Sequence, residues 1–175
     1  MSNPNVNLLD KLLEKVLQIS KVSYEQEVDR SKQLLAKSDY LIKYLSTIFV
    51  FVNIFLPLAF KYNIINLKVL AFIYFAISVP LIFSLFLSIK SQRLRLGMFF
   101  PTGKYLLEEM KRNQDKFNTE IKMKNKSILY YSTSTETLQK TNDERAKNLK
   151  AAYTSYFSSI IILAVAIFSI MIIVA

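Results

Sequence analysis

Two groups of side chains in this sequence could do chemistry, and both suit binding rather than catalysis. The stretch KMKNKSILYY places three lysines within five residues and two tyrosines shortly after them. Ammonium groups attract phosphate and aromatic rings stack on nucleobases, so the sequence predicts contact with an anionic nucleotide or oligonucleotide. With the basic residues that precede this stretch, the basic–aromatic group consists of Arg93, Arg95, Lys104, Lys122, Lys124, Lys126, Tyr130 and Tyr131.

The charge of this group has a second interpretation, which the sequence leaves open. Lysine and arginine gather on the cytoplasmic side of membrane proteins, where they also contact anionic lipid headgroups. Under this interpretation the basic residues set the orientation of the chain in a membrane, and no nucleotide is needed to explain them.

The second group is mildly polar and lies inside apolar sequence. Small residues let membrane helices approach closely, so a stripe of them could serve helix packing. A stripe of hydroxyls and small side chains could equally line a pore built from several copies of the chain. Asn53 could join helices or form a constriction, and the remaining pore-lining candidates, Ser155, Ser159, Ala166 and Ser169, share one helical face.

Several kinds of catalysis are excluded by composition. The chain has no cysteine and no histidine, which removes Cys or His metal sites and the nucleophile–histidine arrangements of many hydrolases. The long apolar runs contain no Asp, Glu, Lys or Arg, the residues that mark proton relays and coupled transport. We therefore expect no enzyme, no cofactor and no metal.

Three uncharged runs set the architecture. Residues 44–60, 69–89 and 156–175 are each about as long as the roughly 20 residues that cross a bilayer as a helix. The sequence thus predicts an all-α membrane protein with three transmembrane helices and a cytoplasmic helical bundle. Its expected parts are a cytoplasmic N-terminal helix (1–43), a two-helix transmembrane hairpin (44–89), a cytoplasmic helical hairpin (90–155) and a C-terminal transmembrane helix (156–175).

Turn signals interrupt the second cytoplasmic part in two places. Both glycines of the chain lie in GMFFPTGK, where the second span must give way to a cytoplasmic helix in a new direction. Gly97, Pro101 and Gly103 are therefore expected to form an elbow, which could be a plain turn or a hinge. The STST stretch at 132–135 predicts a second turn. Residues 5–43 contain neither Gly nor Pro and predict a helix that continues into the first span.

Basic residues predict the orientation. Residues 1–43 carry seven Lys and Arg, residues 90–155 carry fourteen, and the short link 61–68 carries two. By the positive-inside rule the two long segments face the cytoplasm. We expect a plasma membrane protein with a cytoplasmic N-terminus and its C-terminus at the outer face.

The layout resembles the small membrane effectors of bacterial anti-phage systems. DRSKQLLAKSDYLIKYLSTIFVFVNIF is similar to the start of the SLATT class of effectors, while the third span and the FFPTGK elbow bring the outline closer to the channel effector of Hailong-type systems. This resemblance implies an oligomeric pore in the bacterial inner membrane that acts in abortive infection. It also implies an oligonucleotide signal made by a partner nucleotidyltransferase.

The sequence therefore predicts a homo-oligomeric ion channel or pore-forming effector, gated through its cytoplasmic part by an anionic nucleotide or oligonucleotide. Membrane lipid and further copies of the chain are its expected partners. The alternative is a non-conducting membrane anchor or scaffold that holds a cytoplasmic partner by its helices.

Overall fold

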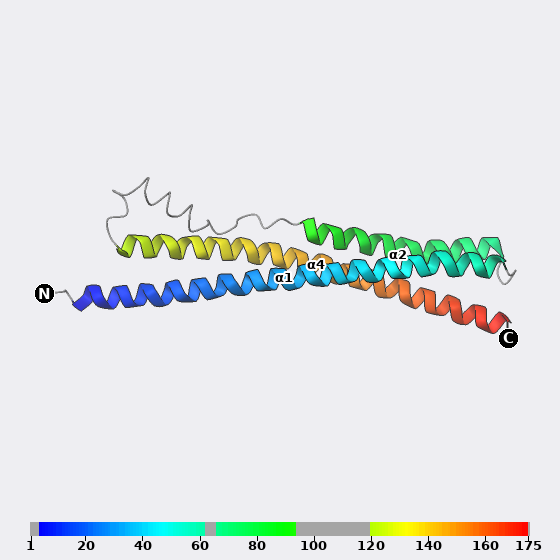
Figure 1. Ribbon diagram of the computed structural model, residues 1–175, viewed down its shortest axis with the longest axis horizontal. Helices are drawn as coiled ribbons and strands as arrows, with labels where there is room; N and C mark the ends of the chain where they lie inside the picture. The colour runs from blue at the N-terminus through cyan, green and yellow to red at the C-terminus, as the bar shows by residue number, and fades with distance from the viewer. Residues whose placement is uncertain (1–3, 62–65, 94–119, 175) are drawn as a thin grey trace. The chain divides into compact units, whose positions relative to one another are not determined.

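Three α-helices make up the part of the chain that the structure, a computed structural model, describes: residues 4–61, 66–93 and 120–174 (Figure 1). They are α1 (Pro4–Lys61), α2 (Leu67–Arg93) and α4 (Glu120–Val174), and no strand occurs in these ranges. Each helix contains a segment long and apolar enough to cross a membrane. The all-helical fold and the three candidate spans are confirmed. The elbow residues Gly97, Pro101 and Gly103 lie outside the described residues.

The three helices run without interruption, although α1 and α2 each contain an internal proline, Pro57 and Pro80. The prediction that the N-terminal helix continues into the first apolar run is confirmed, since α1 covers both. The prediction of a turn at 132–135 is wrong, because α4 passes through these residues. Thr135 donates to the Tyr131 carbonyl at 2.7 Å and Thr137 to the Thr133 carbonyl at 2.9 Å. The hydroxyl of Thr135, which helped to suggest a turn, is thus satisfied four residues back along the same helix.

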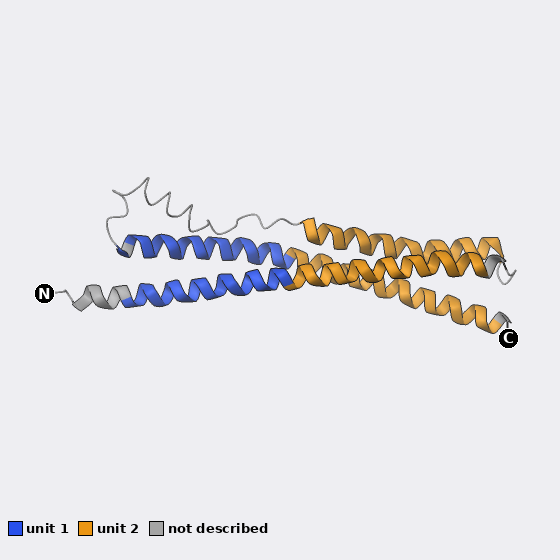
Figure 2. Ribbon diagram, viewed as in Figure 1, with its two compact units in different colours: residues 1–32, 95–143 blue, residues 33–94, 144–175 orange. Residues whose placement is uncertain are grey.

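The chain divides into two compact units (Figure 2). Unit 1 comprises residues 1–32 and 95–143, and unit 2 comprises residues 33–94 and 144–175. Both α1 and α4 contribute to both units. Unit 2 holds all three apolar runs, and it also includes the charged stretches that lead into the first and third runs.

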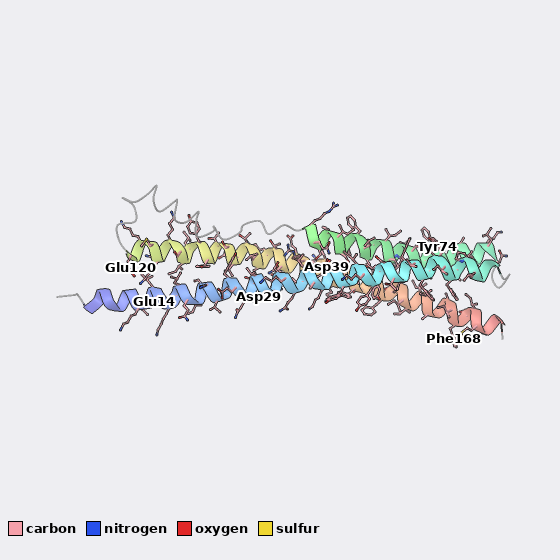
Figure 3. All side chains as sticks on the ribbon, in the orientation of Figure 1. Glu14, Asp29, Asp39, Tyr74, Glu120 and Phe168 are labelled. Carbon is pink, nitrogen blue, oxygen red and sulfur yellow. The ribbon has the colours of Figure 1, made fainter. Side chains whose placement is uncertain are left out.

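Unit 2 is a three-helix arrangement with a core of leucine, isoleucine and small residues. The buried residues of α1 recur at spacings of three, four and seven, the pattern of helices that pack at a shallow angle. Large apolar side chains on the outside remain exposed, as expected of a surface that faces lipid: Phe72 is 74% and Phe168 is 66% exposed. Phe168 is labelled on α4 in Figure 3. The buried hydrophobic cluster of this unit is Leu41, Leu45, Val52, Leu56, Ile77, Leu81, Leu87, Ala152 and Leu163.

Buried serines hold the three helices of unit 2 close together. Ser38 on α1 donates to the Ser88 carbonyl on α2 at 3.0 Å, and Ser84 on α2 donates to the Ala152 carbonyl on α4 at 2.7 Å. All three serines are fully buried. A serine that reaches a backbone carbonyl of the next helix requires close approach of the two backbones, which only small side chains allow.

Unit 1 contains a pair of helical segments, residues 11–32 of α1 and 120–143 of α4. The ring of Tyr24 meets the ring of Tyr131 edge-on at 5.7 Å, and further along both helices Asn142 contacts Glu27. The two segments therefore run in the same direction. Leu138 is buried within this unit, and most other side chains of the interface are half-buried.

Replacing Ser84 tests the close packing of unit 2. Ser84→Leu should lower the thermal unfolding midpoint of the detergent-solubilised protein much more than Ser84→Ala. The alanine variant loses one hydrogen bond of about 0.6 kcal/mol. The leucine variant adds side-chain volume to a packed site, which costs about 1–3 kcal/mol. The exposed Ser158→Leu is the matched control and should leave the midpoint nearly unchanged. Equal effects of Ser84→Leu and Ser158→Leu would contradict this close packing.

Candidate functional site

The basic–aromatic group separates into two faces of α4. Lys122, Lys126 and Tyr130 recur every four residues and so lie on one face, with Lys122 exposed and the other two half-buried. The ammonium group of Lys126 lies 5.6 Å from the centre of the Tyr130 ring, a cation–π distance. This face therefore combines positive charge with an aromatic ring, the two features that the sequence proposed for an anionic nucleotide.

Lys124 and Tyr131 belong to a different face of the same helix. The ammonium of Lys124 lies 3.1 Å from the Glu120 carboxylate, and the Tyr131 ring packs against Tyr24 of α1. Burial in this packing raises the pKa of the Tyr131 hydroxyl above its ordinary value. These two residues therefore serve the helix pair of unit 1, and the structure does not place them with Lys122, Lys126 and Tyr130.

The three other members of the predicted group lie elsewhere. Arg93 is exposed at the end of α2 and belongs to unit 2. Arg95 and Lys104 lie outside the described residues. Nothing in the described part of the chain brings Arg93 together with the lysines of α4.

A polar cluster around the buried Asn142 of unit 1 was not predicted from the sequence. The amide of Asn142, which is fully buried, donates to the Glu27 carbonyl and to the Glu27 carboxylate, both at 2.8 Å. Arg30 donates to the Asp143 carboxylate at 2.8 Å and lies 3.5 Å from Glu27. The hydrogen bond to Asp143 raises the pKa of the Arg30 guanidinium, and the neighbouring Glu27 charge acts in the same direction. We call Glu27, Arg30, Asn142 and Asp143 the Asn142 cluster.

The Asn142 cluster fixes how α1 pairs with α4 in unit 1. A buried asparagine tolerates few alternative registers, because a slip of the helices would leave its amide unpaired in the interface. The Arg30–Asp143 ion pair is solvent-exposed and contributes little stability. Asn142 follows the buried Leu138 by four residues and precedes the buried Arg145 by three. This spacing is the signal that could have found it.

Arg145 is the largest fully buried side chain of unit 2. Sequence analysis placed it only among the basic residues expected in the cytoplasmic part of the chain. In the structure its Nε donates to the Ser91 carbonyl of α2 at 3.3 Å. Burial lowers the pKa of the Arg145 guanidinium below its ordinary value. Arg145 therefore links α4 to α2 instead of lying on the basic surface.

The pore-lining candidates of the third run occupy different environments. Ser159 and Ala166 are buried inside unit 2, where they serve helix packing. Ser155 is half-buried, and Ser169 is exposed. The four residues share a helical face in sequence, but only Ser169 fully faces the surroundings of unit 2.

Asn53 lies on the exposed surface of unit 2 and joins α1 to α2. Its amide nitrogen donates to the Phe49 carbonyl at 2.7 Å, and its amide oxygen accepts from the Tyr74 hydroxyl at 3.0 Å. Tyr74 is itself partly exposed, and it projects from α2 in Figure 3. The second N–H of the Asn53 amide has no acceptor among the described residues.

Exposed hydroxyls in the apolar runs differ from Asn53. Ser46 donates to the Ile42 carbonyl, Ser158 to the Thr154 carbonyl and Ser169 to the Val165 carbonyl, all at 2.8–3.0 Å. A hydroxyl has one donor, and here the preceding turn of the helix accepts it. These serines can therefore face lipid without a partner from another chain.

An apolar groove of about 300 Å³ lies between α1 and α2 of unit 2. Ser46 is its one polar lining residue, and the rest are Leu45, Phe49, Val50, Leu81, Ile82 and Leu85. Within residues 4–61, 66–93 and 120–174, no group of three acidic side chains is placed to hold a metal ion.

No protein-family model, curated protein or solved structure matches this chain. The resemblance to anti-phage membrane effectors therefore stays a hypothesis drawn from layout and one stretch of sequence.

Replacing Asn142 tests the role of its cluster. Asn142→Ala should destabilise the protein by about 1–3 kcal/mol, because it removes the buried amide that donates to the Glu27 carbonyl and carboxylate. Gln139→Ala, at an exposed position of the same helix, should change stability by less than about 0.5 kcal/mol. Chemical denaturation of the full chain, followed by circular dichroism, gives both values. Similar results for the two variants would show that Asn142 does not fix the helix pair.

Proposed function

We propose that this protein is a homo-oligomeric membrane pore controlled through the helix pair of unit 1. The observation that carries the proposal is the exposed Asn53–Tyr74 pair on apolar helices. An amide that faces hydrocarbon with an unused N–H is unfavourable, because lipid tails offer no acceptor. Contact with a second copy, or with water between copies, would supply the missing partner.

The water-filled path of such a pore would lie between copies. The helices of unit 2 pack around buried leucine, isoleucine and serine side chains, which fill the space between them. Asn53, Tyr74 and Ser169 are polar and at least partly exposed, as are Ser46 and Ser158, so these side chains could line a path between subunits. Ser159 and Ala166 are better explained by packing within one chain.

The proposed location is the bacterial plasma membrane, with the N-terminus in the cytoplasm and the C-terminus at the outer face. Its support is the distribution of Lys and Arg, which are concentrated in residues 1–43 and 90–155. Three spans agree with it, since an odd number places the ends on opposite sides.

Control by an anionic ligand is supported by the face of α4 that carries Lys122, Lys126 and Tyr130. A nucleotide or oligonucleotide could place phosphate near the lysines and a base on the ring. The resemblance to anti-phage effectors supports a signal of this class from a partner nucleotidyltransferase, and a role in defence.

The alternative function is a non-conducting anchor that holds a cytoplasmic partner. It is favoured by apolar side chains of α1 that remain exposed before the first apolar run, among them Leu12 and Ile19. A partner protein could bind this surface while unit 2 only fixes the complex to the membrane.

Ion flux distinguishes the two functions. Purified protein in liposomes should release a trapped ion gradient, and Asn53→Leu should reduce that flux. Removal of one interhelical hydrogen bond of about 1 kcal/mol weakens assembly about fivefold. Ile54→Leu replaces an exposed neighbour on the same helix and should leave the flux unchanged.

The outcome that contradicts the pore is absent flux for the wild-type protein, with insertion into the liposomes verified. If the wild-type protein and Asn53→Leu conduct equally, the protein is still a pore, but residues other than Asn53 line it.

Ligand binding is tested with a labelled four-nucleotide single-stranded DNA. Lys122→Ala/Lys126→Ala should weaken its binding and reduce the log–log salt slope by about 0.7 for every phosphate that the protein no longer neutralises. Lys140→Ala removes an exposed lysine further along α4 and should have little effect on either quantity. If Lys140→Ala and the double variant weaken binding equally, the attraction is general charge and the proposed face is wrong.

A further inference from the structure

An apolar surface on α1 stays exposed in the described part of the chain. Leu12, Val16, Ile19 and Val22 are 52%, 45%, 65% and 45% exposed. They adjoin the face of α1 that packs in unit 1, where Leu13, Leu17 and Tyr24 are half-buried. We call the four exposed residues the α1 stripe.

The α1 stripe is not explained by burial in a membrane. Its last residue, Val22, precedes the apolar run 44–60 by 22 positions, and the intervening sequence carries charges such as Arg30 and Lys37. In the topology proposed above this part of α1 lies in water. Apolar side chains at regular spacing in water mark a binding surface.

We propose that the α1 stripe binds the α1 stripe of a second copy of this chain, with the two helices parallel. Leu12, Val16 and Ile19 are spaced by four and then three residues, the repeat of a coiled-coil seam. Val16 takes an a position and the other two take d positions. A β-branched residue at a with leucine at d suits a two-stranded parallel pair; Val16 and Leu12 follow this rule, and Ile19 at the second d position departs from it.

Charges beside the seam fit this arrangement. In a parallel pair, each g residue faces the e residue of the next heptad on the partner helix. Lys15 then faces Ser20, so this pairing sets no like charges against each other. The following e position is Glu27, which contacts Asn142 of α4 within the same chain. The apolar Val22 beside the seam widens the contact.

The membrane favours a second copy over other occupants. Helix α1 continues from the stripe into the first apolar run, so every copy that enters the membrane in one orientation presents its stripe in the same direction. Confinement to one membrane raises the effective concentration of these short seams. The stripe spans only about one and a half heptads, from Leu12 to Val22, which makes this tethering important for its association.

The inference rests on the homo-oligomer proposed above and names a surface outside the membrane that joins copies. It is tested by disulfide cross-linking, since the sequence contains no cysteine. Full-length Ile19→Cys in membranes should form a covalent dimer under mild oxidation at least tenfold faster than Lys21→Cys. Lys21 is exposed on another face of the same helix turn and is the matched control.

Two results would overturn the assignment. One is equal cross-linking of Ile19→Cys and Lys21→Cys, and the other is cross-linking of Ile19→Cys to a different protein only. A second variant tests whether the cross-link depends on the stripe and not on the oxidant alone. Val16→Glu, added to Ile19→Cys, should slow the cross-link at least tenfold while circular dichroism shows unchanged helix content, and an unchanged rate would also overturn it.

Measuring the oligomer mass of the wild-type protein in nanodiscs separates this inference from the proposed function. An oligomer with ion flux but without the Ile19 cross-link refutes the α1 stripe alone. A monomer without flux refutes both.

Discussion

Polar groups inside the apolar helices must find hydrogen-bond partners in the protein, because hydrocarbon supplies none. In unit 2 the buried Ser84, within the second apolar run, donates to the Ala152 carbonyl of α4. Ser38, which precedes the first run, donates to the Ser88 carbonyl of α2, and the two bonds draw α1, α2 and α4 together. Exposed serines such as Ser169 donate within their own helix instead. Ser78 departs from this pattern, since its buried hydroxyl has no partner among the described residues. Asn53 differs from these serines because it is exposed and its amide has more donors than the described residues accept.

The contacts that hold unit 1 together differ from those of unit 2, because its helices have fewer buried side chains and more charges. Asn142 and Glu27 fix one register of α1 against α4, and the Tyr24–Tyr131 contact adds apolar packing. The same α1 segment leaves Leu12 and Ile19 exposed on an adjoining face. A helix with one packed and one exposed apolar face is suited to join copies, and Lys122 and Lys126 lie on a separate face of α4.

The helices and candidate spans could be predicted from sequence, because charge-free runs of membrane length depend on composition alone. The continuous helix through 132–135 could not, since serine and threonine hydroxyls bond equally well within a turn or to the preceding turn of a helix. The sequence does contain the information that Lys122 and Lys126 lie on a different helix face from Lys124, because residues four apart share a face and residues two apart do not. The Asn53–Tyr74 bond, the Asn142 cluster and the burial of Arg145 depend on which helices are neighbours and in which register, and the periodicity of single helices does not contain that information.

The central claim is that copies of this chain enclose a conducting path through a membrane. Single-channel recording tests it most directly, with the purified wild-type protein in a planar lipid bilayer. We predict discrete, reversible current steps of uniform size, because an assembly of fixed subunit number encloses one defined path. A bilayer that stays silent although it contains the inserted protein, or current that grows without steps, would contradict the claim.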